Sequence, residues 1–443
     1  MPPKQEVYIN FSHKLKYILK YAQSVKKEYL KRIVDKKLDV LLASTGAVLI
    51  KGPKWCGKTR TAEERAAGAV YMQDPKEQSN YSEILRTDPS ILLDGRAPRL
   101  IDEWQTAPIL WDAVRFAVDR RGEPGQFILT GSAVPADGAT MHTGTGRIAH
   151  LLMRPMTLFE SLESNGSVSL RSLFGGSDAK GTSSLTLDGL AFALVRGGWP
   201  ISVGERSPLA FQHAENYVEA VIESDISRVD GVAKNPANVR MLMRSLARNT
   251  STAAKLTAIR DGMSADGRIS DKTVASYMNA LRRIFVIEDL PPWGPDMRSK
   301  AALRSSPKRH FADPSIAANL LRVFPEGLMK DFNTFGLLFE SLCIRDLRVY
   351  AQANDGEVYH YRDKDGLEID AVVALHDGRW GAFEIKIGAG SADKAAENLL
   401  KLRNKVNTEK IGEPSFMAVL TASAYAYRRG DGILVVPIGC LKD

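Results

Sequence analysis

Residues 52–59 have the residue types and spacing needed to bind a triphosphate. Their sequence, GPKWCGKT, matches the pattern G-x-x-x-x-G-K-[ST] at every fixed position. The apolar run 47–50 predicts a buried strand before this segment, and the Ala-, Glu- and Arg-rich residues 59–67 predict a helix after it. Such a strand, loop and helix N-terminus form an anion site, because backbone N–H groups point inward and the helix dipole favours negative charge.

The chemistry of phosphate binding assigns a role to each fixed position. Gly52 and Gly57 let the backbone curve around phosphate oxygens. Lys58 is expected to reach the β- and γ-phosphates, and the Thr59 hydroxyl is expected to ligate magnesium. The expected cofactors are therefore ATP and Mg²⁺. The residues expected to line the nucleotide are Gly52, Pro53, Lys54, Trp55, Cys56, Gly57, Lys58, Thr59 and Arg60.

Two later strands are expected to complete the ATPase site. Residues 99–103, RLIDE, place two acids at a strand end. Asp102 is expected to hold magnesium, and Glu103 to polarise the attacking water. The strand 127–132, FILTGS, ends in hydroxyls, so Thr130 or Ser132 can sense the γ-phosphate; an ordinary strand-end turn explains them equally well.

An arginine that stabilises transition-state charge is also expected. Arg147 follows the glycine-containing loop 144–146 and can act as an arginine finger in cis or across a subunit interface, the latter in a homo-oligomer. A surface arginine is the competing interpretation. Arg154 is a weaker candidate.

A second set of residues has the composition of a metal-dependent nuclease site. Phosphodiester cleavage needs carboxylates that hold a divalent cation and a lysine that activates water. Glu340, Asp370 and Glu384 are the expected metal ligands, and Glu384 and Lys386 the expected catalytic pair. Glu384 and Lys386 are two apart on a predicted strand, so they share a sheet face. Arg362 can contact a phosphate. The competing interpretation is a sheet with one wet face.

Taken together, these segments resemble the bacterial and archaeal family of AAA-type ATPases that carry a C-terminal domain of unknown function with a restriction-nuclease-like core. The matching segments follow the family's order from about residue 41 onward. They are GPKWCGKT, LIDEWQTAP, ILTGSA, HTGTGR with RPMTLFE, GGWP, TVASYMNALRRIFVIEDLPPW, KRHFADP, GLEIDAVV and FEIKIG. The resemblance implies a nucleotide-binding module, a winged helix and a PD-(D/E)xK-type fold. One departure is residues 59–61, TRT, where relatives often continue with an apolar helix.

The elements that position these residues follow from periodicity. Strands alternate with helices before residue 163, which predicts a parallel α/β sheet. Residues 270–285 predict a capped amphipathic helix, and 286–290 a strand, as in a winged helix that contacts DNA or serves only for packing. The predicted fold class is therefore α/β: a P-loop NTPase sheet, a winged helix-turn-helix and a restriction-endonuclease-like α/β domain. The predicted divisions are 1–38 (basic N-terminal helix), 39–163 (AAA-type P-loop ATPase domain), 164–188 (Ser/Gly-rich linker), 189–325 (helical region with winged helix) and 326–443 (PD-(D/E)xK nuclease-like domain).

Composition and net charge indicate which kinds of partner and which compartment to expect. A net charge of +8 and a pI of about 9.2 favour a polyanionic partner. Nucleic acid is the expected partner, and DNA is favoured over RNA. Three separated cysteines, no signal-peptide core and no run long enough to span a bilayer predict a cytoplasmic protein without membrane contact.

Two functions agree with these features. In the first, ATP hydrolysis controls a nuclease-like domain that acts on nucleic acid. In the second, the chain is a nucleotide-gated DNA- or protein-binding regulator with an inactive nuclease fold.

Overall fold

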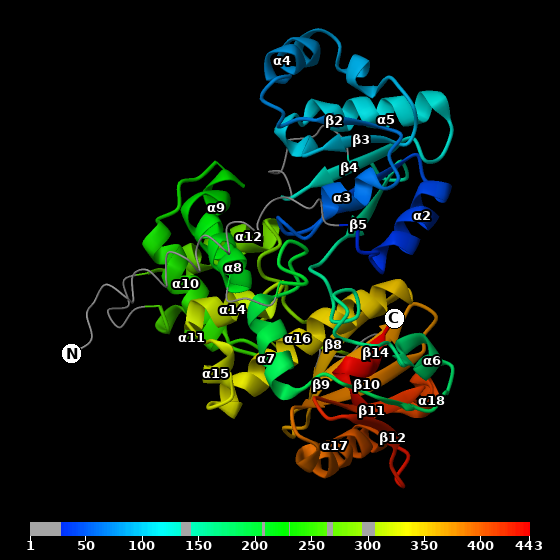
Figure 1. The fold of residues 1–443 in the computed structure, drawn as a ribbon, viewed down its shortest axis with the longest axis vertical. Helices are drawn as coiled ribbons and strands as arrows, with labels where there is room; N and C mark the ends of the chain where they lie inside the picture. The colour runs from blue at the N-terminus through cyan, green and yellow to red at the C-terminus, as the bar shows by residue number, and fades with distance from the viewer. Residues whose placement is uncertain (1–27, 134–142, 206–208, 230, 264–268, 295–305) are drawn as a thin grey trace, which may run out of the picture. The chain divides into compact units, whose positions relative to one another are not determined.

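The computed structural model describes residues 28–133, 143–205, 209–229, 231–263, 269–294 and 306–443 (Figure 1). Most of the predicted basic helix over residues 1–38 lies outside these ranges. Residues Arg32–Asp443 form one compact unit. Contacts between the regions described below are therefore contacts inside a single unit.

The first region is built on a five-stranded parallel sheet with the strand order β2-β3-β4-β1-β5. Its strands are β1 (Ala47–Lys51), β2 (Gly68–Tyr71), β3 (Arg99–Asp102), β4 (Phe127–Gly131) and β5 (Ile148–Leu152). Its helices are α2 (Val34–Ser44), α3 (Lys58–Glu63), α4 (Gln78–Thr87) and α5 (Ile109–Arg121). The predicted parallel α/β sheet is confirmed.

Both faces of this sheet are covered, because successive side chains of a strand point to opposite sides. Leu49 of β1 packs in a cluster with Val114 of α5. Its neighbour Val48 packs in a different cluster with Leu38 of α2. Figure 1 shows α5 on one side of the sheet and α2 and α3 on the other. The carboxyl ends of β1, β3 and β4 therefore meet at one edge, where the loop after β1 lies.

A helical region follows. Its helices are α7 (Leu187–Arg196), α8 (Leu209–Ala220), a π-helical turn (Val221–Asp225), α9 (Ile226–Arg228), α10 (Pro236–Arg248), α11 (Leu256–Asp261), α12 (Asp271–Arg283), α14 (Pro314–Leu321) and α15 (Pro325–Leu328). The capped amphipathic helix predicted near residue 270 is α12, in which Ser270 accepts a hydrogen bond from the Thr273 amide.

The segment after α12 pairs with a later part of the chain. Phe285 has a left-handed backbone (φ 59°), which ends the helix. Ile287 then bridges Phe311 and Leu290 bridges Lys308, both antiparallel, as isolated pairs. The predicted strand 286–290 is therefore reduced to two bridges, and the winged helix stays a prediction.

The C-terminal region has a seven-stranded mixed sheet in the order β7-β12-β13-β11-β10-β9-β8, in which β7 is Gly181–Thr182. Its main strands are β8 (Gly356–Arg362), β9 (Glu368–Leu375), β10 (Trp380–Lys386), β11 (Phe416–Thr421), β12 (Tyr425–Arg428) and β13 (Leu434–Pro437). Its helices are α16 (Phe332–Ala353), α17 (Ala392–Lys405) and α18 (Thr408–Ile411). Phe339 of α16 joins the core on one face of the sheet, and Leu399 of α17 joins the core on the other.

Residues 164–188, expected to be a linker, contain short regular elements that join the C-terminal region. They contain β6 (Val168–Ser169), α6 (Leu170–Phe174) and β7 (Gly181–Thr182). β7 pairs with β12 at the edge of the C-terminal sheet, and β6 pairs with β14 (Leu441–Lys442). Leu170 and Leu173 are buried in the same core as α16. The Ser and Gly content concealed these apolar residues, which are spaced for one helix face.

A buried charge network ties the three regions together. Arg345 of α16 donates to Asp313 Oδ2 (2.8 Å) and Asp346 Oδ1 (2.7 Å). The other Asp346 oxygen accepts from the Leu158 amide (2.9 Å), and Asp313 Oδ2 also accepts from the Gly198 amide (3.0 Å). Removing one member would leave a buried charge unpaired, so the network opposes separation of the regions.

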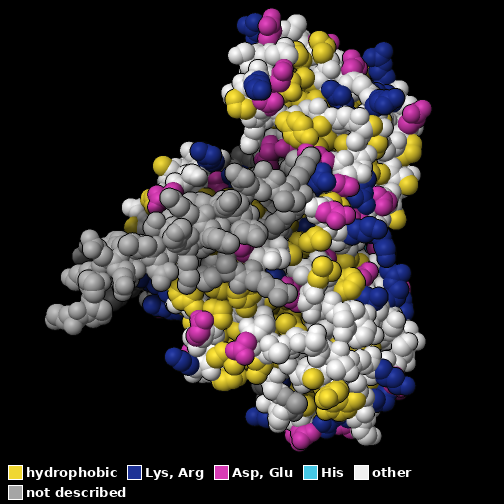
Figure 2. All heavy atoms as spheres, in the orientation of Figure 1, with side chains coloured by type: hydrophobic (Ala, Val, Ile, Leu, Met, Phe, Trp, Pro, Cys, Tyr) yellow, Lys and Arg dark blue, Asp and Glu magenta, His cyan; other side chains and the backbone are white. Residues whose placement is uncertain are grey.

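On the face drawn in Figure 2, basic and acidic side chains are interspersed over most of the surface. Of the helices that the structure describes, none has the length and apolarity needed to cross a lipid bilayer.

Candidate functional site

The loop between β1 and α3 needs glycine at two positions. A Cβ on Gly52 would lie 2.0 Å from the carbonyl oxygen of Met153, which no side chain can tolerate. Gly57 adopts φ 104° at the start of α3, a conformation that L-residues rarely adopt. The loop is thus folded tightly against the strand end, with the N-terminus of α3 following it.

Lys58 is the first residue of α3, and its side chain points back into this loop. Its side chain is buried, and Nζ donates to the carbonyl oxygens of Gly52 (3.0 Å) and Pro53 (2.8 Å). These partners are neutral, so the lysine charge is not cancelled by an acid at this point. An entering phosphate can replace the carbonyls as the acceptor.

The hydroxyl and carboxylate residues meet at the carboxyl edge of the sheet. Thr59 Oγ1 donates to Asp102 Oδ1 (2.7 Å), and Thr130 Oγ1 donates to the same oxygen (2.6 Å). Thr130 Oγ1 also accepts from the Glu103 amide (3.0 Å). A hydroxyl and a carboxylate oxygen side by side suit a magnesium ion, which prefers oxygen ligands. These residues therefore fit the expected metal.

Glu103 is held beside this group in an uncommon conformation. Its backbone is left-handed (φ 56°), which is rare for a residue with a side chain and is often found at functional sites. Its carboxylate accepts from Ser132 Oγ (3.0 Å) and from the Gln105 side-chain amide. Gln105 was not foreseen from the sequence, although it lies in the LIDEWQTAP segment. Its Oε1 atom is buried and has no partner among the described residues.

A buried arginine supports the loop from behind. Arg32 donates to the Cys56 carbonyl (2.7 Å), the Arg154 carbonyl (2.8 Å) and Glu160 Oε1 (3.0 Å). Arg32 lies outside the residues expected to form the ATPase domain, and no sequence pattern marked it. It fixes the backbone of the loop at Cys56.

The front of the loop contacts the helical region. Lys54 Nζ forms an ion pair with Asp225 Oδ1 (2.6 Å), at the end of the π-helical turn. The Trp55 ring lies 5.9 Å from the ring of Tyr217 in α8. A cavity of about 290 Å³ opens here, and its lining includes Lys54, Glu103 and Ser132 together with Tyr217, Asp225 and Arg228. The loop that would hold phosphate therefore touches a different region of the chain.

The two arginine candidates lie in different places. Arg147 precedes β5, and its carbonyl accepts from the Ala47 amide at the start of β1. The phosphate loop follows the other end of β1, about 13 Å away along the strand. Arg147 also pairs with Asp119 (2.7 Å). A role in cis does not fit this position, and a role in trans stays a prediction. Arg154 pairs with Glu288 (2.6 Å).

The structure also brings the second set of residues together. Glu340 comes from α16, Asp370 from β9, and Glu384 and Lys386 from β10. Lys386 Nζ contacts Asp370 Oδ2 (2.9 Å) and Glu384 Oε2 (2.6 Å). Asn398 of α17 donates to Glu384 Oε1 (3.3 Å). Arg362, the suggested phosphate contact, is exposed and pairs with Glu368 (3.1 Å).

A second lysine, not foreseen from the sequence, enters this cluster. Lys308 Nζ contacts Glu340 Oε1 (2.8 Å) and Asp370 Oδ1 (3.3 Å). It lies in the KRHFADP segment. The only sequence signal for this segment was that it matches the family resemblance. Within the described ranges, no group of three or more His, Cys, Asp or Glu residues is arranged to hold a metal ion. With Lys308 in place, the cluster does not fit the expected divalent cation.

Burial and charge shift the pKa values of this cluster in opposite directions. Burial, with the nearby Asp370 charge, raises the pKa of Glu340 to about 8. Burial and Asp370 likewise raise the pKa of Glu384 to about 7. Burial acts in the same sense on Asp370, but Lys308 and Lys386 outweigh it and hold the pKa of Asp370 well below its usual value. Asp370 is therefore the anion that the two lysines share.

A wide groove runs past this cluster. Its volume is about 890 Å³, and Glu340 and Lys386 line it. Phe332, which is 52% exposed, and Leu337 add apolar surface at the start of α16. Through this groove, a ligand in solvent can reach Lys386.

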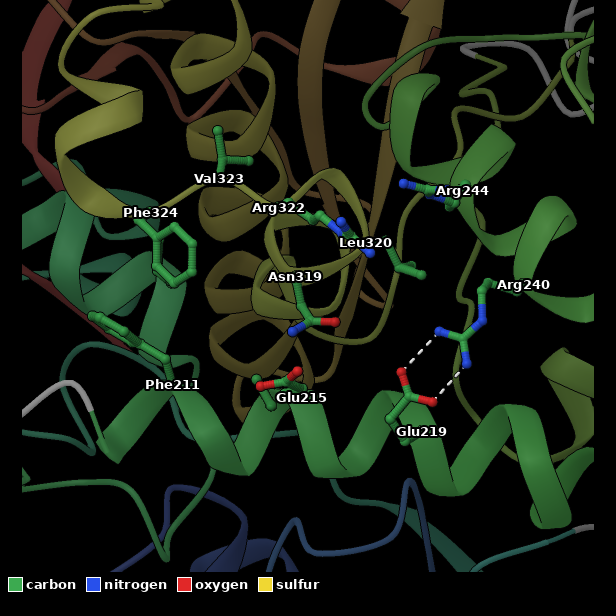
Figure 3. A pocket seen from close by; sticks show the side chains of 12 residues that line it. Phe211, Glu215, Glu219, Arg240, Arg244, Asn319, Leu320, Arg322, Val323 and Phe324 are labelled. Atoms are coloured by element: carbon green, nitrogen blue, oxygen red, sulfur yellow. Dashed lines mark hydrogen bonds and ion pairs between the residues drawn. The ribbon is translucent and has the colours of Figure 1, made fainter.

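Another cavity, of about 270 Å³, lies in the helical region (Figure 3). Phe211 and Phe324 stand at one end, and Glu219 and Arg240 face each other at the other end. Arg240 makes two bonds to Glu219 (2.8 and 2.6 Å), so its charge is compensated within the protein.

Comparisons with known protein families agree with the parallel α/β fold of the first region. Residues 44–162 match the family model of an AAA domain. Residues 187–327 and 335–441 match two domains of unknown function, DUF8612 and DUF4143. The chain thus carries an AAA-type ATPase domain, followed by two regions similar to domains whose function is unknown.

Two relatives similar over most of their length have names that state no function. The uncharacterized proteins Rv2008c of Mycobacterium tuberculosis and Mb2031c of Mycobacterium bovis are each 27% identical over 346 residues, which is 76% of this chain and 70% of theirs. A solved structure, the Walker-type ATPase paby2304 of Pyrococcus abyssi, matches with a TM-score of 0.42 and 16% identity, over 67% of this chain and 97% of that one.

Proposed function

We propose that this protein hydrolyses ATP at the β1–α3 loop and that its nucleotide state controls a C-terminal domain acting on nucleic acid. One observation carries the ATPase part: Thr59 and Thr130 both donate to Asp102, at the edge where Lys58 lies in the loop. Magnesium bound by Thr59 and Asp102 would supply charge neutralisation at the phosphates.

The remaining side chains of the site then have distinct tasks. Lys58 binds the β- and γ-phosphates once they displace its carbonyl partners. Glu103 orients and polarises the attacking water, aided by its bonds to Ser132 and Gln105. Thr130 aligns the two acids, because it bonds the Asp102 carboxylate and the Glu103 amide at the same time.

The contacts at the front of the loop are the proposed route for the nucleotide signal. A triphosphate next to Lys54 competes with Asp225 for the same ammonium group. Asp225 ends a π-helical turn, a local irregularity that is frequent at functional sites. The cavity beside it is also lined by Val286, whose segment leads to the Leu290–Lys308 bridge. Displacement of Asp225 can therefore reach the segment that enters the C-terminal cluster.

Nucleic acid is the proposed target of the C-terminal domain. The chain has a net charge of +8, and six lysines against one glutamate occur in its first 27 residues. Phosphate contacts dominate the affinity of such proteins for nucleic acid. The groove beside Lys386 is open and carries exposed Phe332, which can stack on a base.

The alternative is a nucleotide-gated regulator whose nuclease-like fold is inactive. The specific observation in its favour is Lys308, which already pairs with two of the three expected metal ligands.

The experiment that separates the two compares cleavage of labelled DNA and RNA, with Mg²⁺ or Mn²⁺, in ADP and in a slowly hydrolysed ATP analogue. Cleavage lost in Lys386→Ala and retained in Lys401→Ala, an exposed lysine of α17, supports the nuclease. Nucleotide-dependent binding without cleavage supports the regulator. Binding that ignores nucleotide in both the parent and Lys58→Ala argues against control by ATP in either form.

A further inference from the structure

We propose that the ammonium group of Lys308 occupies the cation position of the Glu340, Asp370 and Glu384 cluster, so that the folded protein binds no divalent metal ion there. This inference does not depend on ATP hydrolysis or on the nucleotide signal. It concerns the charge that holds the C-terminal carboxylates together.

The position of Nζ carries the proposal. Lys308 Nζ lies 2.8 Å from Glu340 Oε1 and 3.3 Å from Asp370 Oδ1, between carboxylates of a helix and a strand. A magnesium ion shared by these two oxygens would need to lie about 2.0–2.1 Å from each of them. That space is taken by the ammonium group, which is hydrogen-bonded to both.

The other oxygen of Asp370 is also fully used. Asp370 Oδ2 accepts from Lys386 Nζ (2.9 Å) and from the Ile385 amide (2.9 Å). An ion that bound Asp370 would therefore have to displace a lysine on either side. It would also have to tolerate the like charge of the lysine that remained.

The fold, rather than a side-chain rotation, places Lys308 here. Its side chain is only 5% exposed. Its backbone is paired with Leu290 in both directions, with N–O distances of 2.8 and 3.0 Å, and the next residue, Arg309, donates to the Thr252 carbonyl (2.9 Å). A lysine held at both backbone and ammonium is part of the core, unlike a surface cation that leaves when a metal arrives.

Each of the three acidic side chains has a hydrogen-bond partner without a metal. Two ammonium groups face three carboxylates, and Asn398 donates to Glu384 as well. This leaves Lys386, at the edge of the groove, as the cation that an incoming phosphodiester would meet. Metal-dependent cleavage at this cluster would then require the loss of the Lys308 contacts.

The test is a Mn²⁺ titration of the full-length chain without nucleotide, followed by electron paramagnetic resonance of the free and bound ion. The parent protein is expected to show no site that depends on Asp370. Lys308→Met is expected to gain one Mn²⁺ per chain, and this site is expected to vanish in Lys308→Met/Asp370→Asn. Lys308→Gln, which keeps a hydrogen-bond donor, is a second variant in case the first does not fold.

The matched control is Lys405→Met. Lys405 also bridges two carboxylates, Asp363 (2.5 Å) and Asp365 (2.8 Å), but on the surface. It should leave Mn²⁺ binding unchanged. A parent protein that binds Mn²⁺ and loses it in Asp370→Asn would overturn the proposal. It would also be overturned if folded Lys308 variants gained no site, because the lysine would then not be what excludes the ion.

Discussion

The proposed ATPase site and the C-terminal cluster are built from the same residue types, but their charges are paired differently. Lys58 bonds to backbone carbonyls and Asp102 to two hydroxyls, so neither charge cancels the other. Lys308 and Lys386 bond directly to carboxyl groups, and both share the Asp370 anion. A site whose lysine and acid are held apart keeps both available for a phosphate and its metal ion. A site whose lysines and acids meet is stable without a ligand.

The largest expected effect breaks the first half of this comparison. Lys58→Ala removes the buried positive charge that the loop encloses, so ATP binding should be lost and turnover should fall by about 10³-fold. Calorimetry with a slowly hydrolysed ATP analogue and a phosphate-release assay measure the two effects. Lys76→Ala, an exposed lysine of the same domain, is the control. Normal turnover in Lys58→Ala would disprove the assignment of this loop.

Glu103→Gln should separate binding from chemistry. Glutamine keeps the size of the side chain but cannot take up a proton, so ATP affinity should persist while turnover falls by about 10²-fold or more. The same two assays apply, with exposed Glu123→Gln as the control. A fall in affinity equal to the fall in rate would show that Glu103 shapes the pocket rather than activating water.

The C-terminal cluster should show itself in the pH dependence of stability. The pKa of Glu340 is raised from its usual 4.5 to about 8, mainly by burial and also by Asp370, against the opposing charges of Lys308 and Lys386. The folded protein therefore keeps a proton that the unfolded chain has released, and this contribution to stability is present below about pH 4.5 and lost as the pH rises to about 8.

Glu340→Gln replaces the carboxyl group by an amide, which stays neutral at every pH in this range. Its melting temperature relative to the parent protein should therefore rise from about pH 5 to pH 8. Thermal unfolding followed by circular dichroism tests this, and Glu397→Gln, an exposed glutamate of α17, should show no such trend. A difference that is constant over this range would mean that Glu340 is already ionised throughout.

The smallest expected effect concerns the contact between the two regions. In the Lys54–Asp225 pair the Lys54 side chain is 43% exposed, so solvent weakens the interaction. Asp225→Asn frees Lys54 for phosphate and should tighten ATP binding by about two- to fivefold. Calorimetry measures this, and exposed Asp188→Asn on α7 is a control. Weaker binding in Asp225→Asn would mean that the pair holds the loop in its binding shape.

Local order decided which parts of these sites could be predicted from the sequence. The strand, loop and helix around Lys58 are consecutive, so one short pattern predicts their contacts. Asp102 and Glu103 follow because parallel strands end at the same edge. By contrast, Lys54 and Asp225 are 171 residues apart, and Lys308 and Asp370 are 62 apart. Sequence periodicity cannot reveal such a pair, because the residues around each member are equally compatible with an exposed side chain.

The error over residues 164–188 has a related origin. Average composition described the Ser- and Gly-rich stretches correctly but could not show that four apolar side chains between them enter a distant core. These are Val168, Leu170, Leu173 and Phe174. Arg147 is the converse case: its sequence context suited catalysis, but strand direction places it at the end of the sheet away from the loop, which does not fit a role in cis.

The pairing of β7 with β12 and of β6 with β14 has a consequence for how this protein can be divided. A gene fragment starting at residue 326 would lack β7, the strand at one edge of the sheet, and β6. Strand β12 would then become an uncovered, aggregation-prone edge. A proteolytic cut between α6 and β7 would leave the two pieces associated through the pairing of β6 with β14. The C-terminal region is therefore no interchangeable cassette, and recombination that swapped it would have to carry residues 164–188 along.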